Sequence, residues 1–211
     1  DLRTSQNFSW ANADSGLVNP LLDPVNDPFI NECFARDVQG AMGECYTKSS
    51  CYNLFINGQY WGLYQTQERG DEKFAETYAG GKDDDYDIIK TKNYPGEYVT
   101  EVDVGTNDAW WDLWQLAREG FSGPHADNYM KALGCNPDGS RNEAFPILLN
   151  PRNLMAFMLN THYMVDGDSP NSAWAEAPNN LYALRCRDDA AVNEPGFFFL
   201  RHDAEHSMGS L

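Results

Sequence analysis

Positive charge is scarce in this sequence of 211 residues: 15 Lys and Arg stand against 32 Asp and Glu, and the formal net charge is −17. Such a balance disfavours nonspecific binding to nucleic acid and to anionic lipid. Long apolar runs are also missing, since no stretch approaches the roughly 18 residues of a membrane-spanning helix. We therefore expect no nucleic-acid partner and no membrane span, in a chain with enough hydrophobic residues (42%) for a real core.

Cysteine pairs of the zinc-binding type are absent as well. The five cysteines show no CxxC spacing and no pairing with histidine, and an odd number cannot all pair within one chain. A disulfide between Cys45 and Cys51, across a short loop, is one alternative, and it would indicate an oxidising compartment. In the other alternative these thiols stay free.

Local signals predict a mixed α+β chain. Residues 1–30 are rich in Asn, Asp and Pro and predict an irregular N-terminal segment. Asn57-Gly58 is a strong hairpin turn between predicted strands at 51–56 and 59–66. The other predicted elements are a helix opening at 71–72, a strand at 86–92, helices at 108–118, 124–133 and from Asn150-Pro151 to about 165, and a hairpin of 181–187 with 197–201.

The predicted helix 108–118 carries an apolar stripe. Trp110, Leu113, Trp114 and Ala117 recur at helical spacing, which predicts that they face the core rather than form a platform for a ligand.

The order of polar residues in the C-terminal third is typical of kinase-like folds. A buried helix is followed by a polar loop, 166–180, then by a hairpin, and then by Asp203. Phosphoryl transfer requires a carboxylate that orients the acceptor and hard oxygen ligands for Mg²⁺. In this layout Asp168 is the catalytic base, and Asn180 and Asp203 are metal ligands. The competing interpretation is that Asp168 and Asn180 are ordinary loop residues.

Several segments resemble the CotH family of atypical bacterial secretory kinases, first associated with spore coats. The most specific is LFINGQYWGLY at 54–64. The others are FARD at 34–37, AMG at 41–43, ER at 68–69, DEKF at 71–74, YDIIK at 86–90, DGD at 166–168, NNLY at 179–182 and FLRHDAE at 199–205. The resemblance covers residues from about 30 to the C-terminus.

The resemblance implies a two-lobed, atypical protein-kinase-like domain over residues 31–211, which we expect to be truncated at both ends. It implies ATP with Mg²⁺ or Mn²⁺ as cofactors and transfer to Ser or Thr of extracytoplasmic, secreted or coat proteins of bacteria. Lys90 is then expected to reach the nucleotide phosphates, and Glu68 to pair with that lysine or face the nucleotide. The loop before Asn180 is longer than the family's, which leaves the choice between Asp166 and Asp168 open.

Two alternatives come from other classes of protein. His202, Glu205 and His206 fit the HxxEH signature of zinc peptidases, although that motif requires a helix and here follows a predicted strand. The altered loop also suits a noncatalytic, pseudokinase module of a larger secreted or surface protein. The sequence leaves the oligomeric state and the acceptor open.

Overall fold

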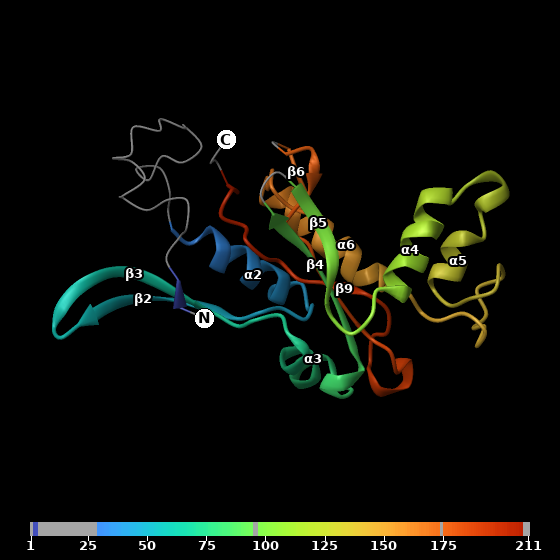
Figure 1. Cartoon of the computed structure of the whole chain (residues 1–211), viewed down its shortest axis with the longest axis horizontal. Helices are drawn as coiled ribbons and strands as arrows, with labels where there is room; N and C mark the ends of the chain where they lie inside the picture. Colours follow the sequence, from blue (N-terminus) through green and yellow to red (C-terminus); the bar gives the residue numbers. More distant parts are fainter. Residues whose placement is uncertain (1, 4–28, 95–96, 174, 209–211) are drawn as a thin grey trace.

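Four antiparallel strands form a sheet at the centre of the molecule, and helices cover both of its faces (Figure 1). The structure is a computed structural model that describes residues 2–3, 29–94, 97–173 and 175–208. Most of the irregular segment expected over residues 1–30 lies outside the described residues. The combination of helices with antiparallel sheets confirms the α+β class that the sequence predicts.

The described residues contain nine strands and five α-helices. The strands are β1 (Leu2–Arg3), β2 (Ser49–Ile56), β3 (Gln59–Gln67), β4 (Tyr86–Tyr94), β5 (Glu97–Val104), β6 (Asn171–Ser172), β7 (Ala177–Pro178), β8 (Tyr182–Cys186) and β9 (Phe198–Phe199). The helices are α2 (Asn31–Ala41), α3 (Glu72–Ala79), α4 (Asp108–Glu119), α5 (Asn128–Ala132) and α6 (Pro151–Tyr163). No helix in this part of the chain is long and apolar enough to cross a membrane.

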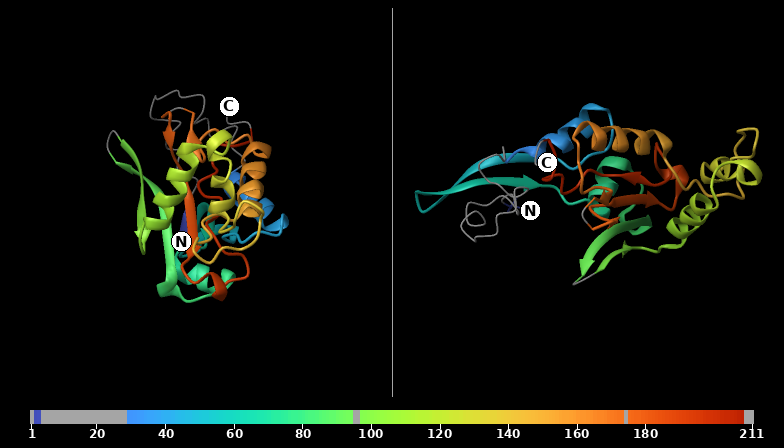
Figure 2. Two further views of the ribbon diagram at one scale, coloured as in Figure 1. Left: turned by 90° about the vertical axis from the view of Figure 1, so that its right-hand side faces the viewer. Right: turned by 90° about the horizontal axis from the view of Figure 1, so that it is seen from above.

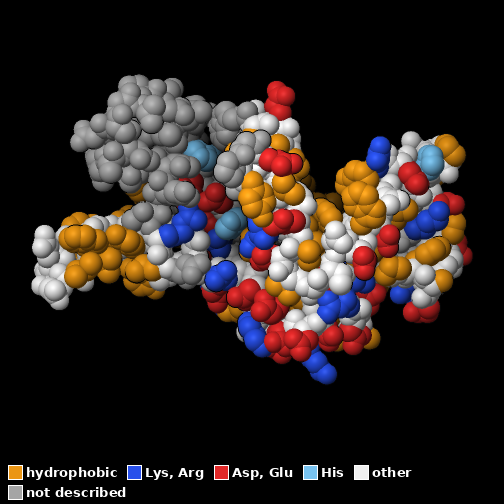
Figure 3. All heavy atoms as spheres, viewed as in Figure 1, with side chains coloured by type: hydrophobic (Ala, Val, Ile, Leu, Met, Phe, Trp, Pro, Cys, Tyr) orange, Lys and Arg blue, Asp and Glu red, His pale blue; other side chains and the backbone are white. Residues whose placement is uncertain are grey.

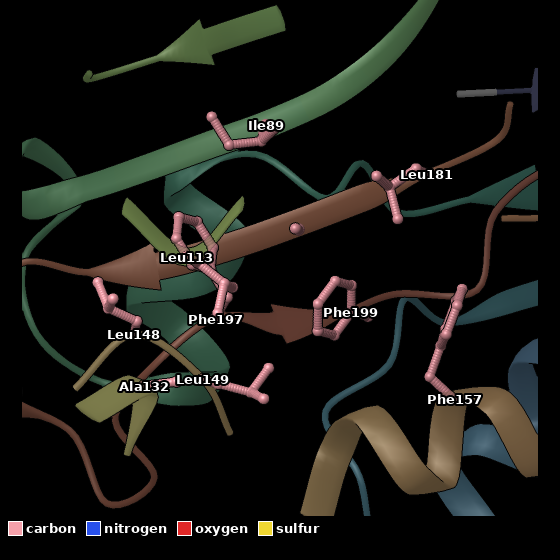
Figure 4. Close-up of a cluster of buried hydrophobic side chains, with 10 residues drawn as sticks. Ile89, Leu113, Ala132, Leu148, Leu149, Phe157, Leu181, Phe197 and Phe199 are labelled. Atoms are coloured by element: carbon pink, nitrogen blue, oxygen red, sulfur yellow. The ribbon is translucent and has the colours of Figure 1, made fainter. Parts of the chain in front are cut away.

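The central sheet has the order β5-β4-β8-β9 and is apolar on both faces. Successive strand residues point to opposite sides, so Ile88 packs against α3 and Ile89 packs toward α4, α5 and α6. The run 197–200 is buried throughout for the same reason. Figure 4 shows the hydrophobic cluster on the Ile89 face of the sheet. Its buried members are Ile89, Leu113, Ala132, Leu148, Leu149, Phe157, Leu181, Ala183, Phe197 and Phe199.

The hairpin of β2 and β3 projects from one end of the molecule, and α4 and α5 lie at the other end (Figures 1 and 2). Asn57 (φ 50°) and Gly58 (φ 81°) both adopt the left-handed conformation that this tight turn requires, which confirms the predicted hairpin. Much of the projecting ribbon is covered by hydrophobic side chains (Figure 3). Those exposed to solvent are Tyr52, Phe55, Ile56, Tyr60, Trp61 and Leu63.

Capping residues set the starts of α3 and α6, as the sequence predicts. The Asp71 carboxylate accepts the backbone N–H of Phe74, and the Asn150 side chain accepts that of Asn153, each at 3.0 Å. The helix predicted at 124–133 is wrong in its first half, where a 3₁₀ turn (Gly123–His125) precedes α5.

The predicted apolar stripe of α4 is half correct. Trp110 and Leu113 pack into the core, but Trp114 and Ala117 are exposed, and Leu116 takes the third core position. The buried stripe is therefore 110-113-116. Which side of α4 is buried depends on how the helix lies on the sheet. Periodicity alone does not distinguish this row from the neighbouring one.

Of the two alternatives for Cys45 and Cys51, the structure shows the one without a disulfide, and all five cysteines are free thiols. Cys45 packs against the hydrophobic cluster around Phe74 and Tyr86, whereas the sulfur of Cys51 contacts that of Cys33. Burial, together with the nearby acidic side chains, raises the pKa of the Cys45 thiol to about 12. A short separation along the chain is therefore no guide to which sulfurs meet.

Polar side chains, rather than another strand, cover the outer edge of β9. The side chain of Gln39, from α2, donates to the Phe199 carbonyl at 2.6 Å and accepts the Arg201 N–H at 2.8 Å. Asn153, from α6, accepts the Phe199 N–H at 2.6 Å. These bonds fix α2 and α6 against the strand that leads to Asp203.

Candidate functional site

A cleft of about 270 Å³ opens between the central sheet, α2 and the base of the hairpin. Its wall includes two of the residues singled out from the sequence, Lys90 on β4 and Glu68 after β3. Tyr182 and His202 also line it, and they lie within two residues of Asn180 and Asp203 in the chain. The cleft and the C-terminal polar residues therefore adjoin one another.

Hydrogen bonds bring together Asp168, Asn180 and Asp203, although the loop after α6 and the hairpin of β8 and β9 lie between them in the chain. The Asp168 carboxylate accepts the side-chain amides of Asn179 and Asn180 at 2.9 and 3.1 Å. The Asn180 amide also lies 3.4 Å from the Asp203 carbonyl. Asn180 and Asp203 both have positive φ, 50° and 53°, a backbone strain that is found preferentially at functional sites.

Asp166 and Asp168 have different environments. The Asp166 carboxylate forms an ion pair with the Arg201 guanidinium, and both side chains are completely buried. Arg201 also donates to the Thr161 hydroxyl at 2.8 Å, and Asp166 accepts the backbone N–H of Asp168 at 2.9 Å. Asp166 thus neutralises a buried arginine and anchors the start of the loop, while Asp168 is only partly buried.

Asp203 lies beside a second carboxylate, that of Glu205. The guanidinium of Arg3, on β1, contacts both carboxylates, at 3.1 Å in the case of Asp203. The Asp203 side chain keeps 29% of its surface exposed. A positive charge is therefore already bound at this place in the structure.

A buried charge network lies directly behind Asp203. Glu32 of α2 accepts the Nε–H of Arg36 at 2.6 Å and the backbone N–H groups of Asp203 (3.2 Å) and Ala204. Burial acts to raise the pKa of Glu32, but the charges of Arg36 and His202 and these hydrogen bonds outweigh it and lower the pKa to about 2. The ionised carboxylate fixes the backbone around Asp203.

Lys90 and Glu68 both line the cleft, but no ion pair joins them in the described part of the chain. Lys90 Nζ lies 2.7 Å from the Asp103 carboxylate and over the Tyr182 ring, 5.6 Å from its centroid. The Glu68 carboxylate accepts the Lys48 backbone N–H and the Tyr78 hydroxyl instead. Glu68 thus lines the cleft without pairing with Lys90, and its role toward a nucleotide stays a prediction.

Asn180 and Asp203 offer the hard oxygen donors that Mg²⁺ and Mn²⁺ prefer. Within residues 2–3, 29–94, 97–173 and 175–208, no group of three or more His, Cys, Asp or Glu side chains is arranged to hold a metal ion. Two protein ligands nevertheless suit an ion that is bound jointly with nucleotide phosphates. The Asp203 carboxylate already binds a cation, the Arg3 guanidinium, and the Asn180 amide contacts the backbone of the same residue, so the two residues fit such an ion.

The HxxEH segment lacks the structure that a zinc peptidase requires. Residues 202–206 form an irregular turn, and the His202 ring packs edge-on against Tyr182 at 5.2 Å between centroids. Without a helix, the side chains of His202 and His206 are not held one helical turn apart on the same side, as binding of one zinc ion by this motif requires.

Three buried residues of this site carry no role in the sequence prediction: Glu32, Arg36 and Arg201. A signal was present for two of them, because Glu32 and Arg36 are four residues apart, as ion pairs on helices are. Their burial could not be foreseen, since it depends on contact with a segment 171 residues further along the chain.

A cleft lined by a lysine, next to which Tyr182 and His202 lead in the chain to an Asp-Asn-Asp cluster, is the arrangement expected of a kinase-like domain. The sequence matches the family model of the CotH kinase protein over residues 15–131, more than half of the chain, and the chain belongs to this family. The match contains Glu68 and Lys90 and ends before Asp168, Asn180 and Asp203. No curated protein matches the chain.

Proposed function

We propose that this domain is a metal-dependent protein kinase that transfers the γ-phosphoryl group of ATP to Ser or Thr hydroxyls. The observation that carries the proposal is the convergence of Asp168, Asn180 and Asp203, next in the chain to residues that line the same cleft as Lys90. Membership of the CotH kinase family supports a kinase-like role. Phosphoryl transfer depends chiefly on positioning and charge neutralisation, which such a cluster provides.

In this proposal Asp203 and Asn180 hold the Mg²⁺ or Mn²⁺ ion against the nucleotide. The ion supplies charge neutralisation at the phosphate oxygens. Glu32 keeps the Asp203 backbone in its left-handed conformation, which directs the carboxylate. Arg3 contacts Asp203 Oδ1, so it must release that oxygen where the ion takes its place.

Asp168 orients the acceptor hydroxyl and accepts its proton. The amides of Asn179 and Asn180 both donate to the carboxylate oxygen Oδ2. Both bonds reach the same oxygen, so Oδ1 is left for the acceptor hydroxyl. Asp166 is excluded from this role in the proposal because its carboxylate is committed to Arg201.

Lys90 neutralises the α- or β-phosphate, exchanging its partner Asp103 for the nucleotide. The acceptor is proposed to be a basic Ser- or Thr-containing segment, because the chain carries a formal charge of −17. In keeping with the spore-coat association of the family, we place the protein outside the cytoplasm, secreted or on a bacterial cell or spore surface.

The test is a calorimetric titration of ATP into the protein with and without Mn²⁺. We expect binding that requires Mn²⁺ and that is lost in Asp203→Ala. Asp112→Ala, which removes an exposed carboxylate from α4, is the matched control and should bind as the unaltered chain does. Circular dichroism verifies that both variants are folded. Equal affinity for the two variants would overturn the metal assignment.

The contact between Arg3 and Asp203 favours a second candidate, a noncatalytic pseudokinase module, because a side chain already neutralises the metal-binding carboxylate. The two functions differ in one measurement. A kinase transfers labelled phosphate from ATP to a basic Ser-containing peptide or to itself, whereas a pseudokinase binds nucleotide or partner without transfer.

A further inference from the structure

Two sulfur atoms from different elements meet beside the base of the hairpin. Cys33 lies on α2 and Cys51 on β2, and their Sγ atoms are 3.5 Å apart. Cys33 Sγ also lies 3.3 Å from the side-chain oxygen of Gln65, the residue opposite Cys51 in the β2–β3 register. The Cys33 residue is 8% exposed, whereas Cys51 is open to solvent.

We propose that Cys33 and Cys51 form a disulfide bond when the protein meets an oxidising environment. The bond length is about 2.05 Å, so the sulfurs need to approach by about 1.5 Å. That distance lies within the range of small side-chain rotations. Both backbones are already held in place, that of Cys33 within α2 and that of Cys51 by its pairing with β3.

The exposure of the two residues sets the order of the chemistry. The Cys51 thiolate attacks a low-molecular-weight disulfide such as oxidised glutathione, and one glutathione leaves as a thiol. The Cys33 thiolate then attacks Cys51 Sγ in the mixed disulfide, and the second glutathione leaves. The protein loses two electrons and two protons, and oxidised glutathione gains both to become two thiols.

Slow reaction at neutral pH is expected from the surroundings of Cys51. Burial and the adjacent Cys33 thiol raise the pKa of Cys51 to about 11, which leaves little thiolate at pH 7. The same two sulfurs become inert once they are joined. The pair therefore suits a bond that forms once, during export or folding, rather than one that cycles rapidly.

The bond would fasten α2 to the hairpin. Glu32, next to Cys33 in the chain, contacts the backbone of Asp203 and Ala204, so α2 is also the support of the candidate metal site. The ring closed by the bond contains the whole connection from α2 to β2. The inference goes beyond the proposed kinase function and does not rest on it, because it concerns only thiol chemistry and stability.

Trypsin separates the relevant cysteines, which makes the pairing measurable. Cleavage after Arg3, Arg36, Lys48 and Arg69 places Cys33, Cys45 and Cys51 in three different peptides. The full chain is incubated with oxidised glutathione at pH 8, alkylated, digested without reduction and analysed by mass spectrometry. We expect the peptides 4–36 and 49–69 to be joined, and dithiothreitol to release them.

Thermal unfolding gives the second readout. The oxidised chain should melt roughly 5–10 °C above the reduced chain, as expected for closing a short loop in a domain of this size. In Cys51→Ser, whose exposed position tolerates the change, that difference should vanish, and Cys45→Ser should retain it. Joined peptides that contain Cys45, or Cys33 and Cys51 still free or only glutathionylated after oxidation, would overturn the proposal.

Discussion

The carboxylate of Asp168 accepts the side-chain amide of Asn180 at 3.1 Å, and the same amide lies 3.4 Å from the Asp203 carbonyl. One asparagine thus joins the loop after α6 to the segment after β9. In the proposed kinase, this contact couples the residue that orients the acceptor to the residues that hold the metal. Substitutions at the two neighbouring aspartates of the loop should therefore have separable effects.

Asp168→Asn should lower phosphoryl transfer by about 10²–10⁴-fold, because the carboxylate that accepts the proton is lost. Its melting temperature should change little. Asp166→Asn should instead destabilise the fold by about 3–5 kcal/mol, since it leaves the buried Arg201 unpaired. Thermal unfolding and phosphate transfer to a basic Ser peptide, measured on both variants, check this. A fully stable but inactive Asp166→Asn protein would reverse the assignment.

Lys90→Met should weaken ATP binding by about 10–100-fold, as expected for one lost charge-assisted hydrogen bond to phosphate. Lys92→Met is the matched control. Lys92 also pairs with Asp103, and with Glu101 at 2.6 Å, but it does not line the cleft. Calorimetry on the two variants distinguishes a phosphate ligand from a lysine that only stabilises β4 and β5. Equal loss in both would contradict the role of Lys90.

Gly196→Ala should destabilise the protein by about 2–4 kcal/mol. Gly196 has φ 92°, and an added Cβ would lie 2.5 Å from the Leu149 carbonyl carbon and 2.8 Å from the Asn150 nitrogen. Gly139 has a similar φ of 86° but open space around it, so Gly139→Ala should cost only about 1 kcal/mol. Chemical denaturation of the two variants isolates the steric contribution. Similar losses would indicate that backbone strain alone accounts for the effect.

Alkylation of Cys45 should be strongly pH-dependent. Burial, then the negative charges of Glu68, Glu44 and Glu194, raise the pKa of this thiol to about 12. A raised pKa means less thiolate at a given pH, so iodoacetamide should modify Cys45 at least tenfold more slowly than free cysteine at pH 8. The rate should continue to rise through pH 10. Peptide-resolved mass spectrometry follows it, and a plateau near pH 9 would contradict the raised pKa.

Local signals accounted for much of the fold. Asn57-Gly58 determines its own turn, and Asp71 and Asn150 each bond to a backbone group three residues away, so short segments of sequence contain the whole interaction. The order of Asp168, Asn180 and Asp203 along the chain likewise pointed to one site. Contacts between segments that are distant in the chain could not be predicted from such local signals. The burial of Glu32 and the meeting of Cys33 with Cys51 depend on how α2 lies against other elements.

The stripe of α4 shows the same limit within a single helix. Rows 110-113-116 and 110-114-117 both have helical spacing, and only the angle at which α4 lies on the sheet selects between them.

The amide side chains along β9 have a consequence for association. Gln39 and Asn153 occupy the hydrogen-bonding groups of Phe199 that another strand would use. The sheet is therefore closed to growth on that side, and neither an extended peptide nor a second copy of the chain can add a strand there without displacing α2 and α6.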